Sequence, residues 1–234
     1  MKPSLRRADF HRVLRRLLAR FGPQHWWPAK FAFEVCVGAV LTQNTAWSNV
    51  ERAIANLRKA HCLNAQPILA LGHQKLASLL RPSGYFNVKA RRLKSFVRFF
   101  TEGCGGSIDR MKQQPTMELR QRLLGVHGVG RETADSILLY ALAKPIFVVD
   151  AYTRRIFARH AWICGEEDYD LIRLRVESNW KNCDDRVKTR DWNELHALLV
   201  AVGKHYCHPK NPACQKCPLK QTLPAKSPLR IHIL

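Results

Sequence analysis

The sequence predicts an all-α fold, and three of its features lead to that prediction. Apolar residues recur at helical spacing along nearly the whole chain. No segment alternates strictly between apolar and polar residues, as a half-buried strand would. Glycines and prolines, which interrupt helices, cluster between the periodic segments. With 234 residues, 46% of them hydrophobic, the chain has material for one large domain or two interlocked small ones.

The first helix is expected at residues 10–21. Its apolar face consists of Phe10, Val13, Leu14, Leu17, Leu18 and Phe21. This segment is amphipathic with a basic outer face, unlike a secretory signal, although an Arg-rich transit peptide remains an alternative. Further helices are expected at 31–41, 49–60, 74–80, 89–100, 117–124, 133–143, 152–160, 169–180 and 192–202. Residues 209–234 are rich in proline and lysine, and they need something other than a core to hold them.

The charge of the chain indicates a polyanionic partner. Its 39 lysines and arginines exceed its 18 acidic residues by 21, and they are spread along the chain. Such a positive field attracts a phosphate backbone and makes binding salt-dependent. A membrane surface would attract it too, but no stretch approaches the roughly 18 apolar residues of a spanning helix. We therefore expect nucleic acid as the partner and no membrane.

The cysteines indicate the compartment. Eight cysteines occur without a secretory signal, which argues against a disulfide framework. Five of them stand singly and are interpreted as buried thiols. We expect a cytoplasmic protein that associates with DNA.

A glycine-containing turn between two helical runs, at residues 124–134, is the most informative segment. Gly128 and Gly130 can adopt the left-handed conformation without a Cβ clash, and they expose backbone N–H groups to a phosphate. Thr133 opens the next helix, whose N-terminus attracts an anion. A tight turn between two packed helices explains the same pattern without a ligand.

A single carboxylate, Asp150, follows this turn after Val148 and Val149. Chemistry at a developing cation requires such a fixed negative charge. The position of Asp150 before residues 151–153 also makes it a candidate N-cap, and a helix N-terminus keeps a carboxylate ionised. The catalytic and the capping interpretations are compatible.

Five motifs occur in order along the chain: LTQNT at 41–45, GYFNVKA at 84–90, the hairpin at 126–134, Val149-Asp150, and Cys207 followed by Cys214 and Cys217-Pro218. Together they resemble the motifs of the helix-hairpin-helix (HhH-GPD) DNA glycosylases of the endonuclease III superfamily. The resemblance implies a six-helix domain at 32–144 that contains the hairpin motif at about 122–143. It also implies a second domain made of residues 1–31 and 145–234, which ends in a cysteine loop at 207–217.

The same resemblance implies an active-site cleft between the two domains. A base stacked in duplex DNA cannot present its glycosidic bond to an enzyme, so the damaged base would be flipped into that cleft. The expected partner is double-stranded DNA with a damaged base, bound by a monomer.

Glu132 departs from the family pattern. Bifunctional members carry a lysine at this hairpin position and form a Schiff base with the sugar, which a carboxylate cannot do. The resemblance therefore implies a monofunctional enzyme, in which water attacks C1′ and an abasic site is the product. Asp150 would stabilise the oxocarbenium-like sugar and orient the water.

Glu132 and a set of tryptophans predict a cationic base as substrate. Trp26, Trp27 and Trp47 offer indole faces, the best cation–π partners, and Pro28 restrains Trp27 in an extended loop. This combination is similar to the 3-methyladenine DNA glycosylase III branch, where the residues matching Trp26 and Trp47 stack on the flipped base. Core packing also explains the tryptophans, and the helix dipole also explains Glu132.

Six residues are predicted to contact DNA. Gln43 matches the family position that fills the gap left in the duplex, and capping of a buried backbone group explains it as well. The hairpin supplies the others: Gly128, Val129, Gly130, Arg131 and Thr133.

Three cysteines reproduce part of the family's [4Fe–4S] loop. Six residues separate Cys207 from Cys214, and two separate Cys214 from Cys217. The fourth family ligand would fall at Leu223, and no cysteine follows it. A cluster with an incomplete or unusual ligand set is favoured, while a structural zinc site and a metal-free loop remain open. Three histidines are candidates for a fourth ligand: His205, His208 and His232.

The sequence therefore predicts a monofunctional DNA glycosylase that excises alkylated purines, such as 3-methyladenine, in base-excision repair. Two alternatives remain: a glycosylase for a mismatched or oxidised base, and a non-catalytic DNA-binding relative. Asp150 argues against the second, because phosphate binding alone gives no reason for a carboxylate among so many cations.

Overall fold

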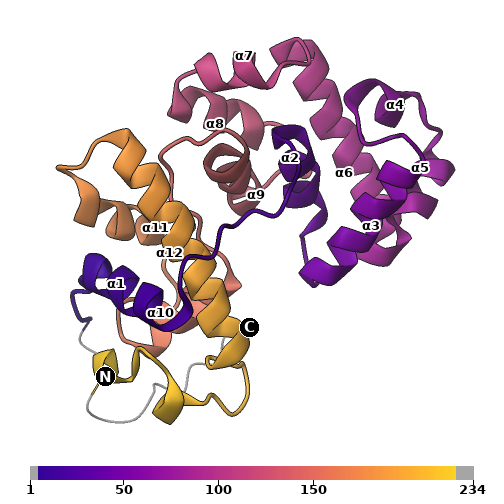
Figure 1. The fold of residues 1–234 in the computed structure, drawn as a ribbon. Helices are drawn as coiled ribbons and strands as arrows, with labels where there is room; N and C mark the ends of the chain where they lie inside the picture. The colour runs from indigo at the N-terminus through magenta and orange to yellow at the C-terminus, as the bar shows by residue number, and fades with distance from the viewer. Residues whose placement is uncertain (1–4, 225–234) are drawn as a thin grey trace. The chain divides into compact units, whose positions relative to one another are not determined.

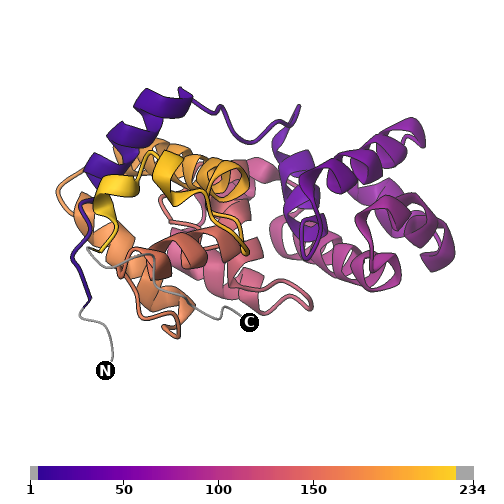
Figure 2. The same cartoon turned by 90° about the horizontal axis from the view of Figure 1, so that it is seen from below.

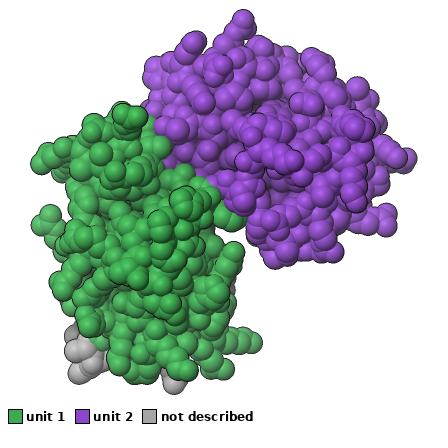
Figure 3. Space-filling model, in the orientation of Figure 1, with its two compact units in different colours: residues 1–26, 145–234 green, residues 27–144 purple. Residues whose placement is uncertain are grey.

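Helices are the regular structure of this chain (Figure 1). The computed structural model describes residues 5–224, and no β-strand occurs among them. The predicted all-α class is confirmed. No helix in this range is long and apolar enough to cross a membrane. The chain forms two compact units, residues 1–26 with 145–234 and residues 27–144, which Figure 3 shows in different colours.

The unit of residues 27–144 is built from eight labelled α-helices. They are α2 (Ala32–Leu41), α3 (Trp47–Lys59), α4 (Ala65–Ala70), α5 (His73–Leu80), α6 (Phe86–Arg98), α7 (Ile108–Gln113), α8 (Thr116–Leu124) and α9 (Arg131–Ser136). Three short helical segments continue α5, α6 and α9: η1 (Arg81–Ser83), η2 (Phe99–Gly103) and η3 (Ile137–Ala141).

Helix α2 is the centre of this unit. Its residues from Phe33 to Leu41 are all buried, so it is covered on every side, as helices without a polar face are. It packs against α3, α6, α9 and η3. Because α3 and α9 both contact α2, the loops at their N-termini are held by a common buried element.

The other unit contains the two ends of the described chain. Its helices are α1 (Phe10–Phe21), α10 (Ala151–Arg159), α11 (Tyr169–Glu177) and α12 (Asp185–His205), with the short segments η4 (Ser178–Trp180), η5 (Cys214–Lys216) and η6 (Lys220–Thr222). Helix α12 packs against α1 and α10, and Figures 1 and 2 both show α1 lying beside α12. The predicted apolar face of α1 is confirmed at Phe10, Val13, Leu14 and Leu17, which are buried.

Helices α4, α7 and α12 differ most from the sequence-based expectation. Helices α4 and α7 were not predicted, because each has only six residues and too little apolar periodicity to detect. Pro67 lies in the first turn of α4, where its missing N–H is not needed. Helix α12 begins at Asp185 instead of residue 192, since Asp184 caps it by accepting a hydrogen bond from the Val187 N–H at 2.9 Å.

Candidate functional site

The hairpin joins α8 to α9 in the unit of residues 27–144. A buried, bidentate ion pair ties the two helices together, with Arg120 on α8 donating to Asp135 on α9 at 2.7 and 3.1 Å. The intervening turn is closed by a hydrogen bond from the Val129 N–H to the Val126 carbonyl at 3.0 Å. The hairpin is thus fixed by contacts on both of its sides.

The two hairpin glycines play different parts. Gly128 has φ +84°, and a Cβ there would lie 2.1 Å from Cγ of Arg92, so both the backbone and the close packing require glycine. Gly130 has φ −89° and open space around it. Of the two glycines that can adopt the left-handed conformation, only Gly128 does so, and Gly130 serves as the N-cap residue of α9.

The remaining hairpin residues are placed as follows. Arg131 and Glu132 are exposed in the first turn of α9, whereas the side chains of Val129 and Thr133 are buried. Helix α9 begins at Arg131, two residues before the predicted start at Thr133. Only the backbone of Val129 is therefore available to a phosphate, while Arg131 and Glu132 present side chains to solvent.

Gln43 is hydrogen-bonded to this hairpin. Its Nε2 donates to the Gly128 carbonyl oxygen at 2.9 Å and lies 3.1 Å from Oγ1 of Thr133. Its Oε1 accepts a hydrogen bond from Arg92, the residue that packs on Gly128. The alternative that Gln43 caps a backbone group is confirmed. Its role in filling a gap in the duplex stays a prediction, and it would require these bonds to break.

Two of the three predicted pocket tryptophans lie together. Trp27 and Trp47 meet edge to face with ring centroids 5.0 Å apart, and Trp27 also contacts Tyr140 at 5.3 Å. A Cβ at Gly38 of α2 would lie 3.1 Å from the Trp27 ring, so Trp27 packs on the core helix. Trp26 belongs to the other compact unit. Trp47 is half-buried at the start of α3, beside a pocket.

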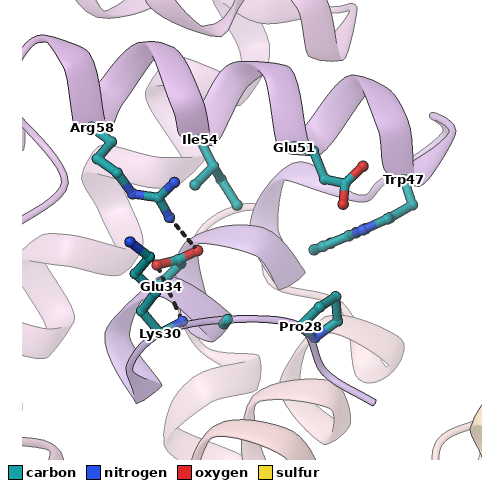
Figure 4. A pocket seen from close by; sticks show the side chains of 8 residues that line it. Pro28, Lys30, Glu34, Trp47, Glu51, Ile54 and Arg58 are labelled. Carbon is teal, nitrogen blue, oxygen red and sulfur yellow. Dashed lines mark hydrogen bonds and ion pairs between the residues drawn. The ribbon is translucent and has the colours of Figure 1, made fainter. Parts of the chain in front are cut away.

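The pocket beside Trp47 has a volume of about 440 Å³ and lies between α3 and the loop before α2 (Figure 4). The Trp47 indole and the Pro28 ring border it, and Glu51 points into the same space. Its other end is formed by buried Glu34, which accepts a hydrogen bond from Arg58 at 2.8 Å. The pocket therefore combines an aromatic face with two carboxylates and two cations, Lys30 and Arg58.

The polar lining of this pocket was not predicted from the sequence. One face of α3 lines the pocket with residues at intervals of four, three and four positions: Trp47, Glu51, Ile54 and Arg58. That spacing was a usable signal. Glu34 carried none, because it lies within an otherwise apolar helix and its partner is 24 residues away.

Asp150 is the N-cap residue of α10 in the other unit. Its Oδ1 accepts a hydrogen bond from the Thr153 N–H at 2.7 Å, which confirms the capping interpretation. Its Oδ2 lies 3.6 Å from Nε2 of His196 on α12. Burial by itself raises the pKa of Asp150, yet the His196 ring and the Thr153 N–H together lower it below its ordinary value. The carboxylate is therefore held ionised although it is only 9% exposed.

Two buried arginines hold the beginning of the cysteine loop. Arg155 donates to the Cys207 carbonyl at 2.7 Å, and Arg159 donates to Cys207 Sγ at 3.1 Å and to the His208 carbonyl at 2.6 Å. Burial, and to a smaller extent the neighbouring thiols, raise the pKa of Cys217 to about 11.

No metal site is established among these residues. Within residues 5–224 no group of three His, Cys, Asp or Glu side chains is arranged to hold a metal ion. Cys214 and Cys217 are half-buried, and Leu223 stands where the fourth family ligand was expected. Of the candidate fourth ligands, His232 lies outside the described residues. The cluster and the zinc site remain predictions from cysteine spacing.

Comparison with known proteins decides the family. The model of the HhH-GPD superfamily of base excision DNA repair proteins matches residues 37–182, more than half of the chain. The chain belongs to this family. As an HhH-GPD protein, it is a DNA glycosylase of base-excision repair.

Curated relatives cover nearly the full length of this HhH-GPD protein. A candidate DNA repair glycosylase of Methanocaldococcus jannaschii is 44% identical over 90% of this chain and 94% of its own length. Endonuclease III of Thermotoga maritima is 27% identical, with 89% of each chain covered.

Solved structures show the same fold. The H. pylori 3-methyladenine DNA glycosylase MagIII, bound to 1,N6-ethenoadenine, has a TM-score of 0.72 and 32% identity, covering 84% of this chain and 97% of its own. A non-covalent endonuclease III–DNA complex has a TM-score of 0.75 with 20% identity, covering 94% of this chain and 96% of its own.

Proposed function

We propose that this HhH-GPD protein is a monofunctional DNA glycosylase for cationic N-alkylated purines, 3-methyladenine first among them, in double-stranded DNA. The N-glycosidic bond breaks with its electron pair on the departing base, which neutralises the charge of that base. The oxygen of a water molecule bonds to C1′, and the water's proton passes to solvent. The products are a free base and an abasic site.

The state of Asp150 carries this proposal. It is buried, and its pKa is lowered, so it offers a full negative charge to a sugar that becomes positive as the bond breaks. A cationic purine is a good leaving group, and its departure needs no strong acid. One fixed carboxylate is therefore enough to promote cleavage of the N-glycosidic bond in this class of substrate.

Glu132 supports hydrolysis without strand cleavage. A Schiff base with the sugar needs a neutral amine. Bifunctional enzymes carry a lysine at this exposed hairpin position, whereas Glu132 has only a carboxylate there. The bifunctional activity would then be absent, although the family also includes endonuclease III proteins.

The tryptophans support a cationic purine as the base. Trp47 presents its indole beside the pocket that also contains Glu51, and an indole face attracts a cation by about 0.5 to 2 kcal/mol. The MagIII neighbour is named as a 3-methyladenine glycosylase and shares 32% of its residues with this chain. Trp26, Trp27, Trp47 and Glu132 are thus our proposed base pocket.

DNA binding would use the hairpin and the positive surface. The backbone of Gly128 to Gly130 and the side chain of Arg131 would contact phosphates, with the net charge of +21 adding long-range attraction. Gln43 would leave its bonds to the hairpin and occupy the gap left by the flipped nucleotide. A single copy of the chain would carry out these steps.

A glycosylase for another lesion is the second candidate, because endonuclease III proteins are relatives over 89% of the chain. A panel of duplexes tests both candidates, each with one lesion: 3-methyladenine, 1,N6-ethenoadenine, an oxidised pyrimidine or a mismatch. We expect alkali-labile sites on the alkylated duplex without spontaneous breaks. Release of only the oxidised or mismatched base would overturn the substrate assignment. Borohydride trapping of a protein–DNA adduct would overturn the monofunctional one.

A further inference from the structure

The two oxygens of Asp150 have different surroundings. Oδ1 caps α10 through the Thr153 N–H at 2.7 Å. Oδ2 faces Nε2 of His196 at 3.6 Å. One oxygen is sufficient for an N-cap, so the second contact is not needed to begin the helix.

His196 is held firmly in its place. It lies in the buried face of the 21-residue helix α12, which packs against α10, and its side chain is 8% exposed. Its ring meets that of fully buried Phe147 edge to face, with centroids 6.3 Å apart. A ring restrained by a long helix and by an aromatic neighbour gives Asp150 a fixed partner.

The torsion of an Asp carboxylate about its last bond is broad, so a single hydrogen bond leaves it free to rotate. Contacts at both oxygens limit that rotation. The distance of 3.6 Å exceeds a hydrogen bond by a little, and such contacts in free enzymes often shorten when substrate binds.

We propose that His196 is a positioning residue that orients the Asp150 carboxylate toward C1′ of the flipped nucleotide. With Thr153 at one oxygen and His196 at the other, the plane of the carboxylate is set before DNA binds. A preorganised charge needs no rearrangement during bond cleavage, and this is where fixed charges gain their effect. The inference depends on the proposed function, because it assigns His196 a role through Asp150.

Single-turnover excision with enzyme in excess tests this inference on the lesion that the wild-type protein removes. His196→Phe keeps an aromatic ring beside Phe147 but loses both nitrogens. We expect it to lower the rate by about 10- to 100-fold, the usual effect of losing an orienting partner. Its Kd for duplex DNA should stay within about twofold of wild type, and His196→Gln, which returns a donor near Nε2, should recover part of the rate.

Two controls separate the possible failures. His73→Phe replaces an exposed histidine in the other unit and should leave the rate unchanged. Asp150→Asn tests the proposed function: if it is fully active, Asp150 is not catalytic and that proposal fails. If Asp150→Asn is inactive while His196→Phe matches wild type, the positioning role alone is overturned. The positioning role would also be overturned if His196→Phe and His196→Gln lost the same amount of excision rate, in proportion to a drop in Tm.

If His196→Phe does not fold, His196→Gln is compared with His196→Asn in its place. The side chain of asparagine is shorter, so its donor cannot reach Oδ2.

Discussion

Gln43 donates from Nε2 to the Gly128 carbonyl oxygen at 2.9 Å, and this bond joins the loop after α2 to the hairpin before α9. The same amide lies 3.1 Å from Thr133 Oγ1 and accepts from Arg92. Gln43 therefore has hydrogen-bond partners at both its nitrogen and its oxygen before DNA binds. Any role inside the duplex must compete with these bonds.

Replacement of Gln43 by leucine should destabilise the protein and reduce excision. Each lost hydrogen bond contributes about 1 kcal/mol, and the Gly128 carbonyl is left without this donor, so we expect a loss of roughly 2 to 3 kcal/mol in urea unfolding. If Gln43 also fills the gap, a duplex should lose more activity than a single strand with the same lesion. An equal loss of excision rate on duplex and single-stranded DNA would show that Gln43 has only a structural role.

Gly128→Ala and Gly130→Ala should differ sharply in stability. At Gly128 the new Cβ meets Arg92 at 2.1 Å and the backbone has φ +84°, so we expect a cost of about 1 to 3 kcal/mol. At Gly130 the φ of −89° and open space predict little change. Chemical unfolding of the pair measures this, and Arg92→Ala in the Gly128→Ala background should restore part of the loss. Similar values for the two alanine variants would contradict the hairpin geometry.

Asp150→Asn should bind a lesion duplex with nearly wild-type Kd while its excision rate falls by about 10²- to 10³-fold, the usual effect of removing a fixed group at the reacting centre. The pKa of Asp150 is lowered in the folded protein, so the carboxylate is charged at and above the ordinary pKa of an aspartate. The stabilising effect of this charge is lost only as pH falls through the lowered pKa. Excision should therefore show no loss from Asp150 protonation between about pH 5 and pH 8. A decline of the Asp150-dependent rate within that range would contradict an ionised carboxylate.

His160 should make stability depend on pH. Burial lowers its pKa from 6.5 to about 4, and a hydrogen bond with Thr222 only partly opposes this. The unfolded chain then binds a proton that the folded chain does not, so the free energy of unfolding falls as pH drops from 6.5 toward 4, by up to about 3 kcal/mol. Thermal unfolding of the wild type and of His160→Phe at about pH 7 and about pH 5 measures the effect. The variant should show a smaller drop in Tm between these values, and an equal drop would exclude His160 as the cause.

Metal analysis should decide the state of the cysteine loop. Arg155 and Arg159 hold the first residues of this loop through its backbone carbonyls, so we expect Tm to depend on these arginines whether or not a metal is bound. Arg159→Met should then destabilise the loop by about 1 to 3 kcal/mol, because it leaves Cys207 Sγ and the part-buried carbonyls of His208 and Pro209 without this donor. About four irons per chain with absorption near 400 nm would establish the cluster that the cysteine spacing predicts.

Local features of the chain were predictable from sequence. The apolar face of α1, the start of α10 behind Asp150 and the existence of the hairpin all depend on residues within a few positions of one another. Spacing and capping chemistry express such short-range relationships directly. The motif order likewise pointed to the HhH-GPD family, which the family match then confirmed. Short helices such as α4 and α7 escaped, because six residues give too few repeats of the helical period.

Composition and residue spacing were enough to predict a helical, strongly basic chain with a carboxylate at a helix start. Which groups meet that carboxylate and the hairpin depends on how the helices pack. His196 reaches Asp150 from 46 residues away, and Gln43 reaches Gly128 from 85 residues away. Such pairs carry no signal in local spacing, because they depend on how separate helices pack. The same packing gave Gly128 and Gly130 different backbone conformations although the sequence presents them alike.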